Sequence, residues 1–249
     1  MPLPELLSFL FVAALGSFVQ AVSGFALGLI LLGSVTLLQL APIPFTAAVI
    51  SMISLVNGGW VLGRHPRAIE WRSVGWISLG LLPTIGLGLA LLARLDSEVP
   101  DLLRRLLGLV ILLAGALLIL RPHPRSQPSG RFSAFLSGVA GGLLGGMFST
   151  AGPPVVFHLY RQPWPLNSIR STLLTIFVLS TLVRIGWQSA RGELVWPMIE
   201  MALYCTVPVL LAAHWGARIA PRIGPVRMRR LAFALLMLTG MGLLLPTAA

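Results

Sequence analysis

Two short polar sequences carry the residue types best suited to chemistry in this chain. Amides, hydroxyls and glycines gather there: Gln20, Ser23 and Gly24 in the first, and Ser149, Thr150 and Gly152 in the second. Amide and hydroxyl groups donate hydrogen bonds to anion oxygens without adding a fixed charge, which keeps binding reversible. The alternative is local, because the same groups can cap a helix or bond to nearby backbone. If the two sequences meet in the fold, we expect them to bind an anion.

Pro153 and Pro154 follow Gly152 directly and are expected to interrupt a helix. Each proline lacks an N–H and disfavours helix at the preceding residue. A helix that begins inside a membrane presents free N–H groups and a positive dipole end, which favour an anion. The glycines before this break have an alternative role in tight helix packing: Gly138, Gly141, Gly142, Gly145 and Gly146.

Asn57 and Arg184 occupy matching places in two similar segments. Each lies roughly 20 Å along its expected helix, which places it deep in a bilayer. An arginine there costs about 2.5–3.5 kcal/mol, so intramembrane ionisable residues are functional candidates. However, Trp187 lies one turn further on and is typical of a membrane interface. Arg184 is therefore either an anion ligand or an anchor that extends to the outer surface.

Three titratable residues near or inside helices are candidates for proton coupling: His158, Glu200 and His214. The alternative for each is placement near a helix end at the interface, with no role in coupling. The sequence has no metal-ligand spacing, Ser–His–Asp set, phosphate loop or Rossmann pattern. We expect no metal, no cofactor and no enzymatic activity. The single cysteine, Cys205, lies in an apolar stretch and is expected to pack there.

The composition indicates an integral membrane protein. Charged residues are 10% and hydrophobic residues 56% of the 249 positions, and mean hydropathy is +0.90, whereas soluble domains are roughly a quarter charged. All 18 basic residues are arginines, mostly between the apolar stretches. This pattern fixes membrane topology, so the net charge of +11 does not indicate nucleic-acid binding. No basic residue precedes the first apolar segment, which is expected to remain as a membrane helix.

The chain also reads as two tandem copies of one unit. Ser54-Leu-Val-Asn-Gly-Gly-Trp60 matches Thr181-Leu-Val-Arg-Ile-Gly-Trp187 at four of seven positions, with an offset of 127. Further matches keep nearly the same register along the whole length, including Gly16 to Phe25 with Gly145 to Pro154. Such self-similarity indicates a repeat architecture.

Each half opens with a broken, Gly-rich segment and continues with three plain helices. The first repeat, 1–120, is predicted to contain a hairpin over 4–40, broken near Ser23-Gly24, and helices 43–63, 73–93 and 102–120. The second, 132–249, is predicted to contain a hairpin over 132–160, broken at Gly152-Pro153-Pro154, and helices 169–189, 196–217 and 228–246. Residues 121–131 form a polar, proline-containing linker.

The distribution of arginines favours opening segments that return to the side they enter from. With two returning hairpins, 13 arginines lie on the linker side and 5 on the other; if the second segment crosses, the split becomes 8 to 10. Because positive loops face the cytoplasm, the hairpins are favoured and the linker is cytoplasmic. A hairpin plus three crossings also turns the second half upside down. The predicted fold class is therefore an all-α polytopic membrane protein of two inverted-topology repeats, with about 8 membrane-spanning elements and both termini outside.

Both opening segments resemble the sulfite exporter TauE/SafE family of membrane permeases. The resemblance rests on Gln20-Ala-Val-Ser-Gly-Phe25, and on Gly141-Gly-Leu-Leu-Gly-Gly-Met-Phe148 followed by Gly152-Pro-Pro-Val-Val156. The layout of two four-element halves is similar over essentially the whole chain. Ala26 and Ser149-Thr150-Ala151 depart from a more glycine-rich family pattern, next to the expected site. The resemblance implies passage of sulfite, organosulfonates or related organic anions across the bacterial cytoplasmic membrane.

The sequence thus predicts a secondary anion transporter. The resemblance implies export more often than uptake, whereas the residues themselves indicate no direction. Its partners would be a small anionic substrate, membrane lipid and, if coupled, protons; the oligomeric state is left open. Two alternatives remain at this stage: an anion channel of the same fold, and a membrane-embedded enzyme or accessory subunit.

Overall fold

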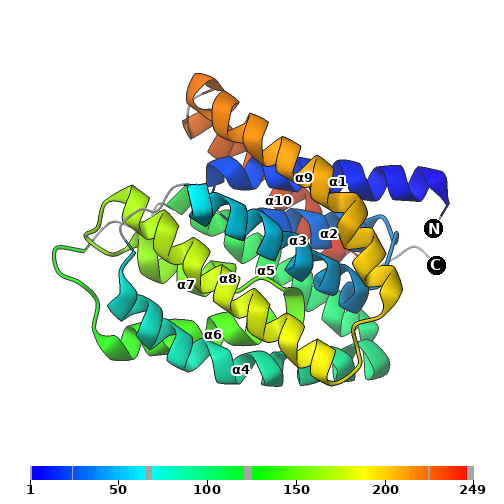
Figure 1. Cartoon of the computed structure of the whole chain (residues 1–249), viewed down its shortest axis with the longest axis horizontal. Coiled ribbons are helices and arrows are strands. Elements are labelled where there is room, and N and C mark those ends of the chain that lie inside the picture. The colour runs from blue at the N-terminus through cyan, green and yellow to red at the C-terminus, as the bar shows by residue number, and fades with distance from the viewer. Residues whose placement is uncertain (1, 24, 65–68, 121–124, 224, 246–249) are drawn as a thin grey trace.

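The computed structural model describes residues 2–23, 25–64, 69–120, 125–223 and 225–245. Over these residues the regular structure is entirely α-helical, which confirms the predicted all-α class (Figure 1). The first half holds α1 Leu3–Ser23, α2 Leu27–Leu37, α3 Ile43–Arg64, α4 Trp71–Glu98 and α5 Pro100–Leu120. The second holds α6 Arg131–Phe148, α7 Gly152–Tyr160, α8 Leu166–Ala190, α9 Trp196–Ile223 and α10 Pro225–Leu244.

The outer helices have the length and surface of membrane spans. Four helical stretches in the described chain are long and apolar enough to cross a bilayer: Leu3–Ala21, Trp71–Glu98, Asn167–Ala190 and Trp196–Ile219. On α9, exposed apolar side chains recur every four residues, at Leu203, Val207, Leu211 and Trp215. Such a stripe would be costly in water and is suited to lipid. The protein is therefore an integral membrane protein.

Both opening segments are interrupted. α1 is followed by the 11-residue α2, and α6 by the nine-residue α7. At 1.5 Å per residue these helices are roughly 16 and 14 Å long, about half of a 30 Å hydrocarbon layer. Each short helix packs along its longer neighbour, and most of α2 is buried. Short helices with free backbone ends are tolerated at membrane depth when protein covers them in this way.

The second interruption lies just before the Gly-Pro-Pro sequence. α6 ends at Phe148, and Ser149 adopts a left-handed conformation with φ 55°. Pro153 and Pro154 occupy the first turn of α7. The prolines fit there because N–H groups of a first turn have no partner within the helix, so proline loses no hydrogen bond. The prolines therefore start α7, and the left-handed Ser149 ends α6.

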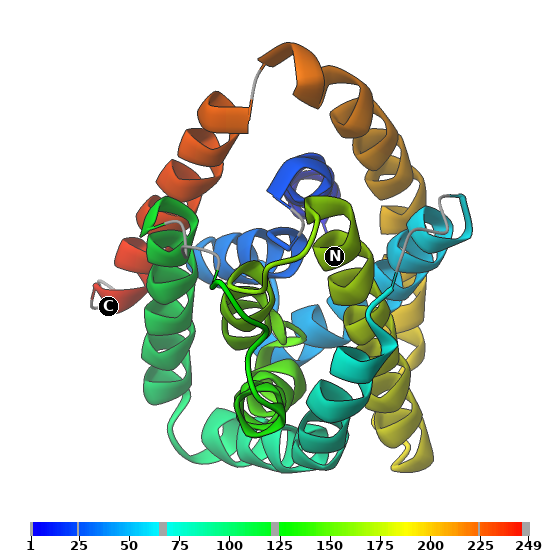
Figure 2. The same ribbon diagram turned by 90° about the vertical axis from the view of Figure 1, so that its left-hand side faces the viewer.

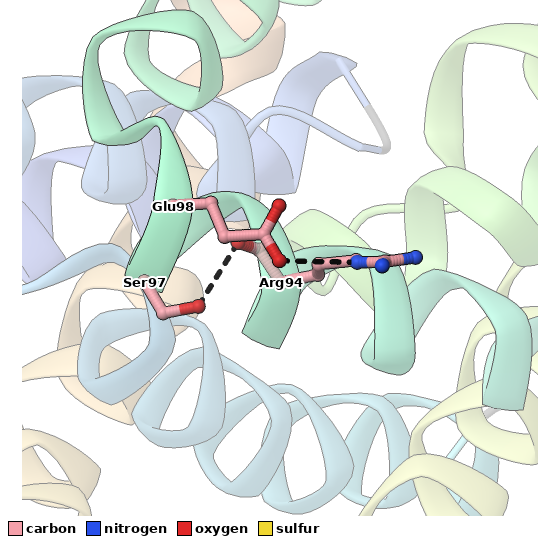
Figure 3. Close-up of polar contacts among 3 residues, drawn as sticks. All are labelled: Arg94, Ser97 and Glu98. Atoms are coloured by element: carbon pink, nitrogen blue, oxygen red, sulfur yellow. Dashed lines mark hydrogen bonds and ion pairs between the residues drawn. The ribbon is translucent and has the colours of Figure 1, made fainter.

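Several helices extend beyond the predicted spans. α4 continues to Glu98 through a polar last turn, in which Arg94 Nε donates to Glu98 Oε1 at 3.2 Å. Ser97 Oγ also donates to the Arg94 carbonyl at 3.0 Å (Figure 3). These exposed i to i+4 and i to i+3 contacts support helix past the end of the apolar stretch.

The two halves pack through matching pairs of helices. α1 lies against α9, and α6 lies against α4. α3 packs on α8, and α5 packs on α10 (Figures 1 and 2). Exchanging the first half for the second converts α1–α9 into α6–α4 and leaves the α3–α8 and α5–α10 pairs unchanged.

Glycines bring α4 and α6 into close contact. A Cβ added at Gly138, Gly142 or Gly146 would clash with carbonyl oxygens of α4. The other two glycines of this run, Gly141 and Gly145, face Ala151, next to α7. All five therefore serve close packing, the alternative role considered for them from the sequence.

Candidate functional site

The two interruptions meet inside the helical bundle. A Cβ added at Gly28, in the first turn of α2, would lie 3.6 Å from the Ser149 carbonyl oxygen and 3.6 Å from Thr150 Cβ. A Cβ added at Gly152, where α7 begins, would lie 3.6 Å from Phe25. The amino-terminal ends of both half-length helices therefore border one region. Both ends carry partial positive charge, so this region favours an anion.

A cavity of about 40 Å³ lies between these ends. That volume accommodates a few water molecules or a small ion, since one water needs roughly 10–15 Å³ measured in this way. Its polar side chains are all uncharged: Gln20, Ser54, Ser149, Thr150, Ser180 and Thr181. These groups offer N–H and O–H donors from four parts of the fold: α1, α3, the segment between α6 and α7, and α8. They could surround an oxyanion with hydrogen bonds that are made and broken readily.

Gln20 also supports the start of α2. Its Oε1 accepts a hydrogen bond from the Leu27 N–H at 3.1 Å. This contact satisfies one of the free N–H groups at that helix end and leaves the Gln20 amide on the cavity wall.

Arg184 lies directly behind the cavity wall. Its side chain is 1% exposed, and its Nη1 donates to Ser51 Oγ at 2.9 Å and to the Ala47 carbonyl at 3.1 Å. Ser51 Oγ lies 2.6 Å from the Oγ of Ser149, which lines the cavity. A chain of two hydrogen bonds thus joins the guanidinium to the cavity.

The remaining contacts of Arg184 join α8 to the end of α6. Nε donates to the carbonyl of Gly146 at 3.1 Å, and Nη1 also donates to Gln188 Oε1 at 3.0 Å. The Gly146 carbonyl is among the last four of α6, which have no partner within their own helix, and the helix end is partially negative. Arg184 therefore caps α6 from α8 while it contacts α3.

No carboxylate of the described residues forms an ion pair with Arg184. In the described parts of the chain, ion pairs are found between Arg94 and Glu98 and between Arg191 and Glu193. Nη2 of Arg184 is buried without a hydrogen-bond partner. Burying an unpaired cation is costly unless another charge compensates it. The site therefore has an excess positive charge that an incoming anion would offset.

Asn57 lies beside the cavity but not on its wall. It is 4% exposed, and its Oδ1 is buried without a partner. Its neighbours Ser54 and Gly58 do line the cavity.

The structure gathers most of the residues selected from the two polar sequences. Gln20, Ser149, Thr150 and Gly152 line the cavity. Pro153 and Pro154 lie in the adjoining first turn of α7. Ser23 is the last residue of α1, and Gly24 falls outside the described residues.

The three candidates for proton coupling lie elsewhere than on the cavity wall. His158 is buried near the other end of α7, where Ser133 and Gln162 contact its ring nitrogens at 3.3 Å. Glu200 accepts a hydrogen bond of 2.8 Å from the exposed Tyr204 hydroxyl. His214 is half-buried on α9.

Sequence reasoning missed the hydroxyls of α3 and α8. Ser51, Ser54, Ser180 and Thr181 contact or line the site. A signal for two of them was available, because Ser54 and Thr181 begin the matching seven-residue segments of the two halves. Ser51 and Ser180 gave no such signal, since isolated serines occur in many membrane helices.

Among the residues that the structure describes, no group of three His, Cys, Asp or Glu side chains could hold a metal ion. Cys205 is a free, buried cysteine of α9, which agrees with a packing role.

Known proteins similar to this chain are membrane transporters. A protein of Cupriavidus necator named "Probable sulfite/organosulfonate exporter TauE" is 38% identical over 231 residues, which cover 93% of this chain and 90% of that protein. A protein of Comamonas testosteroni named "Probable inner membrane transporter protein TsaS" is 27% identical over 191 residues, or 76% of this chain and 77% of that protein. No solved structure matches significantly. The sulfite exporter TauE/SafE family matches residues 9–243, so this chain belongs to that family of membrane transporters and is not an enzyme.

Proposed function

We propose that this protein is a secondary transporter of small anions, such as sulfite, organosulfonates or related organic anions. The observation that carries the proposal is the meeting of two half-length helices, amino-terminal ends first, at a cavity with uncharged donors. The name of the Cupriavidus necator relative supports sulfur oxyanions as the substrate class. A sulfite or sulfonate group presents three oxygens, which suits several weak donors better than one strong one.

The proposed mechanism is alternating access between two inverted repeats. The first repeat is 1–120 and the second 132–249, joined by the linker 121–131. The matching helix pairs support this division, because the closest pairings between the halves, α1 with α9, α6 with α4, α3 with α8 and α5 with α10, form a set that is preserved when the halves are exchanged. Rocking one repeat against the other would open the central cavity to each side in turn.

The proposed location is the bacterial cytoplasmic membrane, with the linker inside and both termini outside. The split of 13 arginines to 5 supports this orientation, and the Comamonas testosteroni relative is named an inner membrane transporter. Export is the proposed direction, following the name of the other relative. If protons drive transport through His158, Glu200 or His214, they must reach the cavity indirectly, because none of these residues lines it.

Flux through reconstituted vesicles tests the proposal. Purified protein in liposomes loaded with unlabelled sulfite should take up labelled sulfite by saturable counterflow, and methanesulfonate should compete. Flux that rises linearly with concentration and shows no counterflow would indicate an anion channel of the same fold. If sulfite, sulfonates and small carboxylates all fail to cross, the transport proposal for this substrate class is wrong.

A further inference from the structure

A second cavity lies at the opposite end of α7 from the central one. Its volume is about 260 Å³, and its polar lining comes from the segment before α6, from α6 itself and from the end of α7. The polar lining residues are Arg125, Ser129, Ser133, Ser137, His158 and Arg161. The described lining is therefore basic: it holds two arginines, three hydroxyls and a histidine, and no carboxylate.

Neither arginine of this cavity forms an ion pair with a carboxylate in the part of the chain that the structure describes. Arg125 Nη1 donates to Ser129 Oγ at 3.1 Å. The Arg161 guanidinium lies 5.2 Å from the centre of the Phe157 ring. The ion pairs found in the described residues involve other arginines. Most of the donors of the two guanidinium groups are therefore available to a ligand, and a guanidinium matches the geometry of an oxyanion in a bidentate manner.

A buried glutamine fixes the frame that holds the two arginines. Gln162 is 2% exposed; its Oε1 accepts from the Ser129 N–H at 2.9 Å, and its Nε2 donates to Ser129 Oγ at 2.9 Å. The Arg125 N–H also donates to the Arg161 carbonyl at 2.8 Å. These bonds tie the segment before α6 to the end of α7, so the cavity does not depend on the arginine side chains for its shape.

The two cavities are joined by one short helix. Gly152 lines the central cavity, and Pro154, two residues later, lines the basic one. The rise from Gly152 to His158 is roughly 9 Å along α7. An ion leaving the basic cavity would therefore need to move only about that far to reach the donors at the helix start.

We propose that this basic cavity is a binding site for small oxyanions, and that it serves as the vestibule on the linker side of the membrane. The inference rests on the proposed transport function, and its ligand is the same class, a sulfite or sulfonate group. The phosphate of an anionic lipid headgroup shares this chemistry, so the test must distinguish the two sources.

The first experiment measures transport from each side of the membrane. Protein is reconstituted in phosphatidylcholine vesicles, and orientation is determined by labelling a cysteine placed at Gln127. Arg161→Gln should raise the KM for sulfite added on the linker side about tenfold, the effect of about 1.4 kcal/mol for one charged hydrogen-bond donor. Vmax and the KM from the opposite side should stay unchanged, and Arg161→Lys should recover part of the loss. Arg94→Gln, which removes a surface arginine paired with Glu98, is the matched control and should leave both KM values unchanged.

The second experiment does not depend on transport. In detergent, millimolar sulfite or methanesulfonate should raise the Tm of the wild type more than that of the Arg125→Gln/Arg161→Gln variant. This difference would support an oxyanion site even if no flux were found and the transport proposal failed. Equal Tm shifts together with an unchanged linker-side KM would overturn the inference. If the Tm of the wild type and that of the double variant differ only when phosphatidylglycerol is added, the cavity is a lipid headgroup site. That result would also overturn the proposal that the cavity is a vestibule for the transported anion.

Discussion

Replacing Arg184 with glutamine should separate the electrostatic role of this residue from its structural role. The wild-type guanidinium makes four hydrogen bonds across three helices and leaves Nη2 unpaired. Arg184→Gln removes the charge but retains an amide of moderate length. The variant loses the cap on α6, yet it also removes the cost of a buried, unpaired cation. Because these effects oppose each other, the free energy of unfolding should fall by no more than about 2 kcal/mol.

The effect on anion binding should be larger. Two hydrogen bonds, of 2.9 and 2.6 Å, lead from Nη1 of Arg184 through Ser51 to Ser149 Oγ. The charge therefore lies roughly 6 Å from the cavity wall, and at an effective dielectric constant of about 20 it attracts a unit anion there by about 3 kcal/mol. This energy corresponds to about a hundredfold in affinity. Arg184→Lys keeps the charge and loses the fork geometry, so its KM should stay within about tenfold of wild type.

The assay is saturable sulfite flux into vesicles, with Tm in detergent measured on the same preparations. A KM that changes less than threefold in Arg184→Gln, in a protein that retains its Tm, would refute the electrostatic argument. Loss of flux together with a large loss of Tm would show that Arg184 acts mainly as a cap. Arg94→Gln again controls for removal of one arginine, because Arg94 is exposed and lies at the end of α4.

Three further predictions concern packing, the left-handed residue and topology. Gly138→Ala should lower the free energy of unfolding by about 1–3 kcal/mol, because the added methyl group would meet the backbone of α4. A methyl group added at Gly186 meets nothing within 4 Å, so the control variant Gly186→Ala should not be destabilised. Thermal unfolding of the two variants measures the difference. Ser149→Gly suits φ 55° and should keep the Tm, but loss of the hydroxyl should raise the KM for sulfite about fivefold. Cysteines placed at Gln127 and Ser97 should react with an impermeant maleimide from opposite sides of the membrane, and labelling from one side would defeat the proposed orientation.

Local sequence signals located the interruptions of the helices well. Glycine and proline at 152–154 marked a break in the apolar run, and the structure has one directly before it. The helix break lies before the prolines rather than at them, because proline is excluded from a helix interior but not from a first turn, where it has no hydrogen bond to lose. The left-handed Ser149 carried no comparable signal, since serine adopts that conformation only where its surroundings impose it.

The site was harder to predict because it forms between helices that are distant in sequence. Gln20 and Ser149 could be selected because they are polar residues near the expected breaks of two apolar, glycine-containing segments. Ser51 and Ser180 face the site only because of the rotation of α3 and α8 in the bundle, which tertiary packing determines. Arg184 was identified from the cost of burying it, but the alternative of an anchor reaching the outer surface could be judged only from its 1% exposure.

The position of Arg184 also relates the anion to the motion of the two halves. Its hydrogen bonds run from α8 of the second half to α3 of the first and to the end of α6. A movement of one half against the other would therefore exchange these bonds while the charge stays buried. With the cavity empty, the unpaired charge disfavours any intermediate in which these bonds are broken, whereas a bound anion offsets the charge throughout the movement. In the proposed cycle, the protein with an anion bound would then switch between its two conformations more readily than the empty protein. This difference is the condition under which anion-for-anion exchange is faster than net, one-way anion flux.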